Sequence, residues 1–194
     1  MPIPSEVAVR SATFGSDGWL WPAGSVVAYA VPAFAAWHNG LPAAPVVLLS
    51  SILALGLITL SEIDRKSFRL PDPITLPLLL AGLLAATIIG EGIVWHLVSA
   101  AIGFAVILLV DYGYRAWRGV SGIGLGDAKL FAAAGAWLGA AALPTVLLWS
   151  CVLALLALLA ARLSGRQLTA QTAIPFGSFL AYGTWLVWCL GPLH

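Results

Sequence analysis

The chain is built of long apolar runs separated by short polar breaks. A helix that spans a bilayer needs about 20 mostly apolar residues, and seven runs approach or reach that length. In chain order they cover residues 19–37, 44–63, 74–89, 93–116, 128–142, 143–163 and 174–190. The pattern therefore predicts an all-α, polytopic transmembrane bundle of about seven spanning helices.

The first of these runs carries the weakest pattern. Pro22, Gly24 and Pro32 interrupt it, although a retained helix remains our interpretation. The alternative is the apolar part of a signal peptide, because Ala28-Tyr29-Ala30 is similar to a cleavage site. In that case six spanning helices would remain.

Composition supports a membrane protein and excludes some other classes. Hydrophobic residues make up 61% of the chain and charged residues 9%, and the mean hydropathy is +0.99, far from the composition of a soluble domain. The net charge of +1 gives no basic field for nucleic acid. The two cysteines stand in separate apolar runs without a metal-ligand spacing, so we expect neither a metal nor an organic cofactor.

The positions of Lys and Arg predict the orientation in the bilayer, because cytoplasmic loops carry the excess of positive charge. All nine basic residues fall on one predicted side: Arg10, Arg65, Lys66, Arg69, Arg115, Arg118, Lys129, Arg162 and Arg166. We therefore expect residues 1–18 to form a cytoplasmic tail, and residues 19–194 a single membrane-embedded domain whose carboxyl terminus lies outside.

Two aspartates are the strongest candidates for chemistry. Asp64 ends the second apolar run and Asp127 precedes the fifth, so both are expected at the same cytoplasmic membrane level. Two carboxyl groups that share a site hold one proton between them. Such a pair can activate water and protonate a leaving amine, which is what peptide hydrolysis requires. The sequence leaves open which aspartate is the base.

The other polar residues at this level have simpler interpretations. Asp72 precedes a proline and is expected to cap the next helix. Glu62 is expected to be a charge at headgroup level, and Asp111 to pair with Arg115 four residues later. Lys129 is expected to pair with Glu62 or with a lipid phosphate.

Alternating glycines precede the second aspartate. Gly122, Gly124 and Gly126 lead into Asp127, and glycine permits left-handed backbone and close approach of another chain. We expect these residues to form a surface for a neighbouring helix or a bound peptide.

Three motifs resemble one protein family. Residues 124–130, Gly-Leu-Gly-Asp-Ala-Lys-Leu, resemble the Gly-x-Gly-Asp-x-Lys motif of the prepilin peptidases, the bacterial branch of the GxGD intramembrane aspartyl proteases. Asp64 together with residues 70–75 resembles the first aspartate motif of that family. Residues 174–180 are similar to its Pro-Phe-Gly-Pro-Phe-Leu signature, except that Ser178 replaces the second proline.

The resemblance implies the GxGD protease fold, with Asp64 and Asp127 as the catalytic pair. It implies cleavage of the short basic leader of type IV pilin-like precursors at the cytoplasmic face of the bacterial inner membrane. The implied supporting residues are Gly124, Gly126, Lys129, Asp72, Pro175, Phe176 and Gly177. The chain has no match to the insert with two Cys-x-x-Cys pairs that accompanies methylation in longer members, so the resemblance is to the short Flp or Tad form, and we expect no methylation.

Two other functions stay open. A noncatalytic assembly subunit could bind pilin helices with the same fold. A small transporter could pass protons or cations along Asp64, Asp111 and Asp127, although such a path should cross the membrane, whereas these residues are all expected on one side of it.

Overall fold

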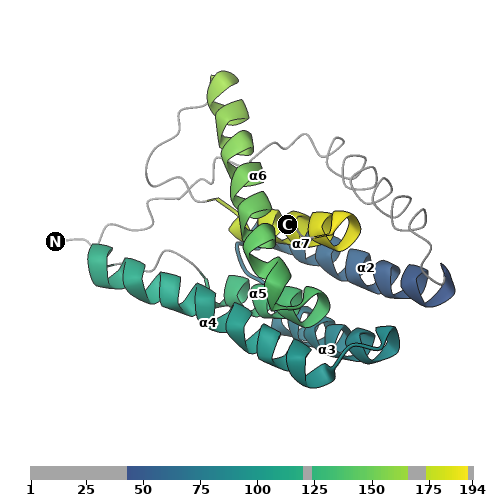
Figure 1. Ribbon diagram of the computed structural model, residues 1–194. Helices are drawn as coiled ribbons and strands as arrows, with labels where there is room; N and C mark the ends of the chain where they lie inside the picture. Colours follow the sequence, from purple (N-terminus) through teal and green to yellow (C-terminus); the bar gives the residue numbers. More distant parts are fainter. Residues whose placement is uncertain (1–42, 120–123, 166–173, 192–194) are drawn as a thin grey trace.

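The computed structural model describes residues 43–119, 124–165 and 174–191, and within them all regular structure is helical (Figure 1). The helices are α2 (Ala43–Ser67), α3 (Asp72–Ile89), α4 (Ile93–Arg118), α5 (Leu125–Leu138), the 3-10 turn η1 (Ala140–Ala142), α6 (Leu143–Leu163) and α7 (Phe176–Leu190). The all-α prediction is therefore confirmed for these residues. The expected tail 1–18 and the expected first helix, 19–37, lie outside the described residues.

Three segments are long and apolar enough to cross a membrane: Asp72–Ile89, Ile93–Arg118 and Ala140–Leu163. The helix α7 is also apolar, but it is shorter, with 15 residues. The helix α5 ends at Leu138, before the predicted end at residue 142, because Gly139 turns the chain with a φ of 78° and a 3-10 turn follows. The total of six or seven spans stays a prediction.

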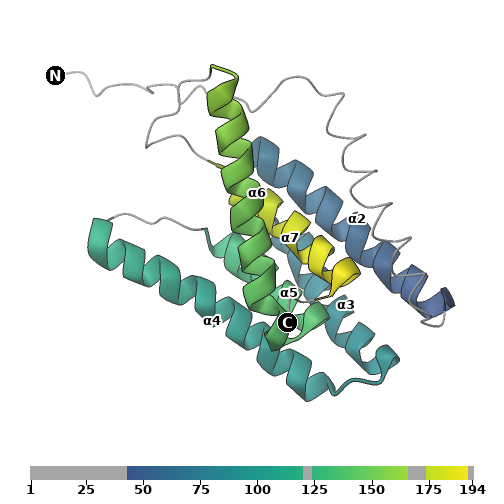
Figure 2. The same cartoon turned by 45° about the horizontal axis from the view of Figure 1, so that its top comes forward.

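The short helix α5 lies at the centre of the bundle. It packs against α3, α4, α6 and α7, and Figures 1 and 2 show it enclosed by its neighbours. Nearly every residue from Ala128 to Trp137 is buried, as expected of a helix that is apolar on all sides. The first turn is more open, because Leu125 is 59% exposed and Asp127 is half-buried.

Small residues allow α4 and α5 to approach each other closely. A Cβ built on Gly103 of α4 would lie only 2.6 Å from the carbonyl oxygen of Phe131 on α5. On the other side of α5, the indole N–H of Trp137 donates a buried hydrogen bond of 2.8 Å to the Leu78 carbonyl of α3. Close packing of this kind holds membrane helices together, since lipid gives no hydrophobic drive for helices to associate.

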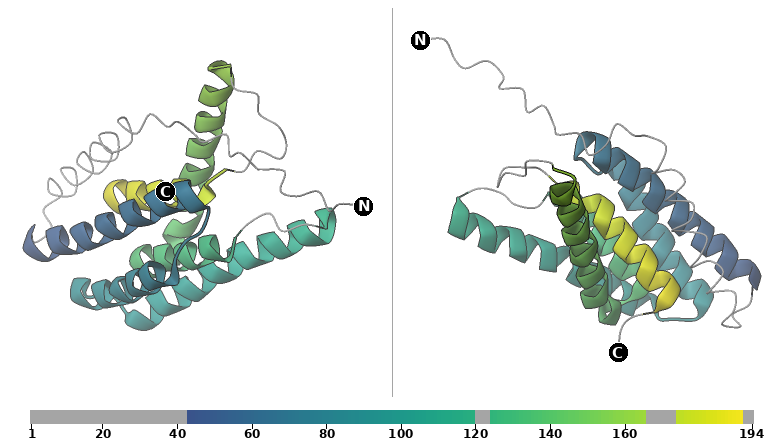
Figure 3. Two further views of the ribbon diagram at one scale, coloured as in Figure 1. Left: turned by 180° about the vertical axis from the view of Figure 1, so that it is seen from behind. Right: turned by 90° about the horizontal axis from the view of Figure 1, so that it is seen from above.

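The remaining helices form the outer part of the bundle. The helix α7 lies between α2 and α6 (Figure 2), and the Trp188 indole N–H of α7 donates to Ser50 Oγ of α2 at 2.9 Å. Near the start of α4, the buried His96 contacts the Ala136 carbonyl through Nδ1 and Glu91 through Nε2. Among the described residues, α4 and α6 make no extensive contact, and they diverge (Figure 3).

The close approach at Gly103 predicts a measurable cost for one methyl group. Gly103→Ala should lower the free energy of unfolding by about 1–3 kcal/mol, because the added Cβ meets backbone that cannot move aside easily. Thermal unfolding in detergent, followed by tryptophan fluorescence, measures the change.

Gly113→Ala on the same helix is the matched control, because a Cβ there has no atom within 4 Å. It should be neutral or raise the free energy of unfolding by up to about 1 kcal/mol, since Ala is the better helix former. Equal destabilisation by the two variants would contradict the proposed packing.

Candidate active site

Asp64 lies in the last turn of α2 and is only 4% exposed. Directly after the helix, Phe68 takes a φ of 53°, and its N–H donates to the Asp64 carbonyl at 2.8 Å. A left-handed conformation is unusual for a bulky residue. Here it ends α2 and turns the chain so that Leu70 crosses towards α5.

Asp127 is the third residue of α5 and is half-buried. Its backbone N–H donates to the Gly124 carbonyl at 3.1 Å, and Gly124 is the N-cap residue. The carboxyl group therefore lies at a helix N-terminus, where the helix dipole favours a negative charge.

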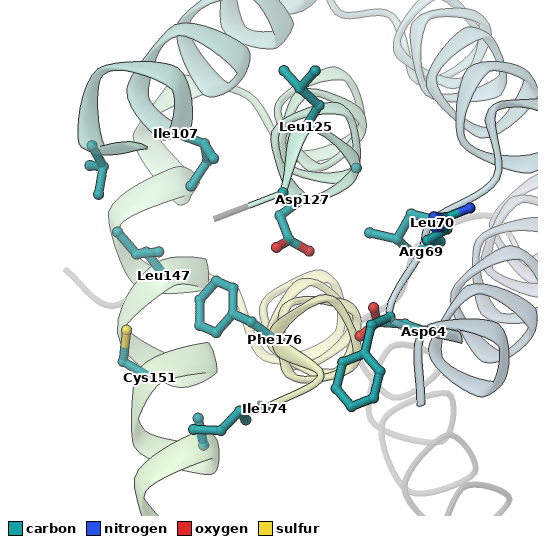
Figure 4. Close-up of a pocket in the computed structure, with 15 residues that line it drawn as sticks. Asp64, Arg69, Leu70, Ile107, Leu125, Asp127, Leu147, Cys151, Ile174 and Phe176 are labelled. Carbon is teal, nitrogen blue, oxygen red and sulfur yellow. The ribbon is translucent and has the colours of Figure 1, made fainter. Parts of the chain in front are cut away.

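The first turn of α7 brings the two carboxyl groups together. A Cβ built on Gly177 would lie 2.9 Å from Asp127 Oδ1 and 3.0 Å from Asp64 Cγ. These two atoms can therefore be no further apart than the sum of the two distances. Figure 4 shows both carboxyl groups directed into the same space beside Phe176. The structure thus pairs the two aspartates as the sequence predicts, and a residue without a side chain lies against both.

Ser178 contacts one carboxyl group of the pair. Its backbone N–H donates to Asp64 Oδ2 at 2.8 Å, and its hydroxyl group lies 3.2 Å from the same oxygen. The hydroxyl group also donates to the Ser61 carbonyl at 2.9 Å. The sequence singled out Ser178 only as a departure from a motif; the clue was a polar residue at the start of an otherwise apolar helix.

Burial shifts the titration of both aspartates, which lie outside the three apolar spans. Burial raises the pKa of Asp127 to about 7, with a further contribution from the negative charge of Asp64, while a hydrogen bond from the Gly124 backbone opposes the rise. Burial also raises the pKa of Asp64, and the hydrogen bonds from Ser178 oppose that rise. Near neutral pH, the pair is thus suited to hold one proton.

A cavity of about 880 Å³ opens beside the two carboxyl groups. Asp64, Asp127 and the α2–α3 loop form its polar end (Figure 4). Its apolar wall comes from α4 and α6, through Ile107, Val110, Leu147, Cys151 and Ala154. This wall could not be predicted from the sequence, because an apolar residue that faces a cavity has the same pattern as one that faces lipid.

The predicted pairing of Lys129 with Glu62 and the predicted helix cap at Asp72 were wrong. Lys129 Nζ donates to Asp72 Oδ1 at 2.5 Å, not to Glu62, which instead pairs with Arg65 at 3.0 Å and with Lys66. Asp72 does not cap α3: Pro71 occupies the N-cap position, and Asp72 is the first residue of the helix. Its carboxylate is therefore free to bind the lysine across the α3–α5 interface.

The glycines before Asp127 behave differently from one another. Gly126 makes the predicted close approach, since a Cβ there would lie 2.9 Å from Leu70 Cβ. Gly124 is exposed, with a φ of −76°, and neither Gly124 nor Gly126 has a positive φ. Gly122 lies outside the described residues.

The other predicted residues lie as follows. Pro175 is the N-cap residue of α7, and Phe176 lines the cavity next to it. Asp111 forms the expected ion pair with Arg115, at 2.6 Å, and does not line the cavity. In the described part of the chain, no three His, Cys, Asp or Glu side chains lie together in a way that could hold a metal ion.

Comparison with known proteins identifies the family of the chain. The model of the type IV leader peptidase family matches residues 51–159, which is more than half of the chain. The chain belongs to the type IV leader peptidase family. The match begins before Asp64 and ends after Asp127, so both candidate residues lie inside it. With its three long apolar helices, this member of the family is an integral membrane protein.

Curated relatives carry a matching name. The chain is 39% identical over 141 residues to the "Prepilin leader peptidase/N-methyltransferase" of Burkholderia pseudomallei strain 1026b, covering 68% of this chain and 42% of the relative. It is 35% identical over 191 residues to the protein of that name from Pseudomonas aeruginosa, covering 96% of this chain and 64% of the relative. The chain thus spans less than two thirds of the length of these relatives. No solved structure gives a significant match.

The ion pair between Lys129 and Asp72 predicts a coupling between two helix starts. In a double-mutant cycle, Lys129→Met and Asp72→Asn should each lower the free energy of unfolding, with a coupling of up to about 1 kcal/mol, because the pair is partly exposed to solvent. Thermal unfolding in detergent at low and high salt measures the coupling and its screening.

Lys66→Met serves as the control for loss of a positive charge. Its Nζ lies 3.5 Å from Glu62 and its side chain is 72% exposed, so the free energy of unfolding should hardly change. Strict additivity of the Lys129 and Asp72 variants would show that the contact between them contributes nothing.

Proposed function

We propose that this chain is a membrane aspartyl endopeptidase that removes the leader peptide of type IV pilin-like precursors, with Asp64 and Asp127 as the catalytic pair. The observation that carries the proposal is the meeting of two carboxyl groups, from α2 and α5, against Gly177 at the polar end of a cavity. Membership of the type IV leader peptidase family supports the reaction type.

The proposed chemistry uses the single proton that the pair retains near neutral pH. The ionised carboxylate takes a proton from water while the water oxygen attacks the peptide carbonyl carbon. The protonated carboxyl group gives its proton to the carbonyl oxygen. When the tetrahedral intermediate collapses, the C–N bond breaks, the amine leaves with a proton from the first carboxyl group, and a hydroxyl group of the intermediate returns a proton to the second. Both products are released and the pair returns to one proton.

The two parts of the cavity suit the two parts of such a substrate. A peptide bond can be cut only where the substrate is extended, and Gly124, which is exposed and has no side chain, leaves room for an extended segment beside the pair. The apolar wall of α4 and α6 suits the membrane helix that follows a leader, because α4 and α6 leave space between them. The substrate helix is thus proposed to enter from the side of the bilayer.

The finer parts of the proposal rest on charge and on motif resemblance. Arg65 and Lys66 follow Asp64 directly, and Arg69 comes three residues after Lys66. These charges favour a cytoplasmic active site in the bacterial inner membrane and a cytoplasmic amino terminus. The resemblance to the short, insert-free form favours Flp or Tad precursors as substrates. A seven-helix GxGD fold, or a six-helix one after removal of the first helix, belongs to the same proposal.

The transporter alternative has less support. It needs Asp64, Asp111 and Asp127 along one path, but Asp111 is bound to Arg115 and does not line the cavity that the other two share. A noncatalytic pilin-binding subunit would have no need of one buried and one half-buried carboxyl group against the same residue, since burial of such groups costs free energy.

Coexpression with a leader-bearing pilin-like precursor tests the reaction. Asp64→Asn and Asp127→Asn should each reduce cleavage by about 10²–10⁴-fold, because an amide can neither accept nor supply the required proton. The size shift of the precursor on a gel, followed over time, measures the rate.

Asp111→Asn is the matched control, since it also removes a buried carboxylate from a helix near the same membrane level. It should keep most of the activity. Full cleavage by either of the first two variants would overturn the mechanism, and absence of cleavage by the unaltered chain would overturn the function.

The native cysteines test the entry route. Cys151 is exposed and lines the apolar wall, whereas Cys189 is buried, so a maleimide should react first with Cys151. Modification should block cleavage, more strongly with a bulkier maleimide, because the added group fills the cavity. Mass spectrometry reports the modification and the gel assay reports the rate.

The matched control for this test is Cys151→Ala, whatever its own rate. The maleimide should not change that rate, because the remaining cysteine is protected by burial. Complete modification of Cys151 with no loss of cleavage would show that the substrate does not pass along α6.

A further inference from the structure

The two carboxyl groups of the pair do not have equivalent surroundings. Ser178 lies within hydrogen-bond distance of Asp64 Oδ2 through both its backbone N–H and its hydroxyl group. Asp127 accepts a hydrogen bond from the Gly124 backbone, and Gly177, the residue before Ser178, presents only its backbone to it. The asymmetry comes from the register of α7, which places one residue against both aspartates and the next against Asp64.

The backbone N–H of Ser178 is the decisive donor. An N–H group can only donate, so its bond of 2.8 Å to Asp64 Oδ2 favours the ionised form of that carboxyl group. The bond is buried, and a buried hydrogen bond to a charged group is stronger than one exposed to water. The same N–H also lies 3.2 Å from the Pro175 carbonyl, and the shorter distance gives Asp64 the larger share of its proton.

The hydroxyl group of Ser178 has a different part. It has a single proton and two acceptors within reach, the Ser61 carbonyl at 2.9 Å and Asp64 Oδ2 at 3.2 Å. The shorter distance gives the carbonyl the larger share of that proton. The hydroxyl group therefore mainly ties α7 to α2 and so holds the N–H in place against Asp64.

Several other titratable or charged groups lie on the elements around the pair. They are Glu62 and Arg65 on α2, Arg69 in the α2–α3 loop, the Asp72–Lys129 pair of α3 and α5, the Asp111–Arg115 pair of α4, Cys151 on α6 and Tyr182 on α7. The hydrogen bonds to Asp64 come from Ser178.

We propose that Ser178 determines which aspartate is the base and which is the acid: Asp64 is the ionised general base, and Asp127 keeps the proton and is the general acid. The inference rests on the proposed function and extends it by assigning the two roles. Ser178 is a positioning residue, since it acts through Asp64 and needs no contact with the substrate.

The assignment gives each proton a defined path. Asp64 takes the proton of the attacking water, while Asp127 protonates the carbonyl oxygen. Asp64 then passes its proton to the leaving amine as the C–N bond breaks, and Asp127 recovers its proton from the hydroxyl group of the collapsing intermediate. At the end of the cycle, Asp64 is ionised again and Asp127 is protonated.

The pH profile of cleavage tests the assignment. The rate should fall on the acid side as Asp64 becomes protonated, and on the basic side as Asp127 loses its proton, near pH 7. Ser178→Pro removes the N–H and the hydroxyl group together, and it should move the acid limb upward by about one pH unit. Proline is tolerated in a first helical turn, and the preceding Gly177 has no Cβ to clash with the proline ring.

Ser178→Ala separates the two donors, because it retains the N–H. Its acid limb should move by less than half as much as that of Ser178→Pro. Ser150→Ala is the control: this buried serine bonds within α6, to the Val146 carbonyl at 2.7 Å, and does not line the cavity. Its acid limb should stay where it is.

A second measurement does not depend on cleavage. In Asp127→Asn, Asp64 titrates without its partner, and the infrared carboxyl band that is lost in Asp64→Asn/Asp127→Asn belongs to it. Adding Ser178→Pro to Asp127→Asn should move the midpoint of that band upward by about one pH unit. This measurement also serves if Ser178→Pro is too slow for a cleavage profile.

The outcomes separate the two proposals. Absence of cleavage by the unaltered chain overturns the proposed function but leaves the infrared shift as a test of the Ser178 contact. Cleavage that slows in the Ser178 variants, with an unmoved acid limb and an unmoved infrared midpoint, makes Ser178 merely structural and overturns this inference. A basic limb that moves while the acid limb stays would reverse the assignment of base and acid.

Discussion

The candidate site depends on one contact, the backbone of Gly177 against two carboxyl groups. A side chain has no space here, because a Cβ at this position would lie 2.9 Å from Asp127 Oδ1 and 3.0 Å from Asp64 Cγ. The start of α7 can reach the pair only as bare backbone, and only there can the N–H of the next residue bond Asp64. The positions of α2 and α5 relative to α7 follow from this contact, since any separation of α7 from the pair would leave a buried carboxylate without its donor.

The lengths of the helices explain why the site has helix N-termini around it. The α-helices α5 and α7 have 14 and 15 residues, so α5 is about 21 Å long, against about 30 Å for the hydrocarbon core of a bilayer. A helix this short begins or ends inside the bundle, and its first N–H groups need partners there. Asp127 lies in the first turn of α5, and Asp64 accepts from the first turn of α7. Because α5 and α7 are shorter than this core, their N-termini lie close to the two carboxyl groups. A helix N-terminus is a favourable neighbour for a negative charge.

Sequence alone predicted the elements well and the contacts unevenly. Apolar runs placed α2, α3, α4, α6 and α7 within a few residues, because length and hydropathy decide where a membrane helix lies. The positions of Asp64 and Asp127 at the ends of apolar runs correctly predicted that the two residues lie close together. The partner of Lys129 was wrong, because depth says nothing about which way a helix is rotated, and Glu62 and Asp72 lie at similar levels. The cap assigned to Asp72 was wrong because Pro71 takes the extended conformation one residue earlier. The role of Ser178 depends on the register of α7 against α2, which no pattern in a single chain encodes.

The same register of α7 explains how one carboxyl group can stay ionised although it is buried. Two carboxyl groups in an apolar bundle would both take up protons if burial acted alone, and neither could then accept a proton from water. A donor that contacts only one of them breaks this symmetry, while the repulsion between the two keeps the proton on the other. Both effects grow stronger as water is excluded. A substrate helix that covers the apolar wall between α4 and α6 would exclude water from the cavity, so substrate binding itself would sharpen the difference between the two aspartates.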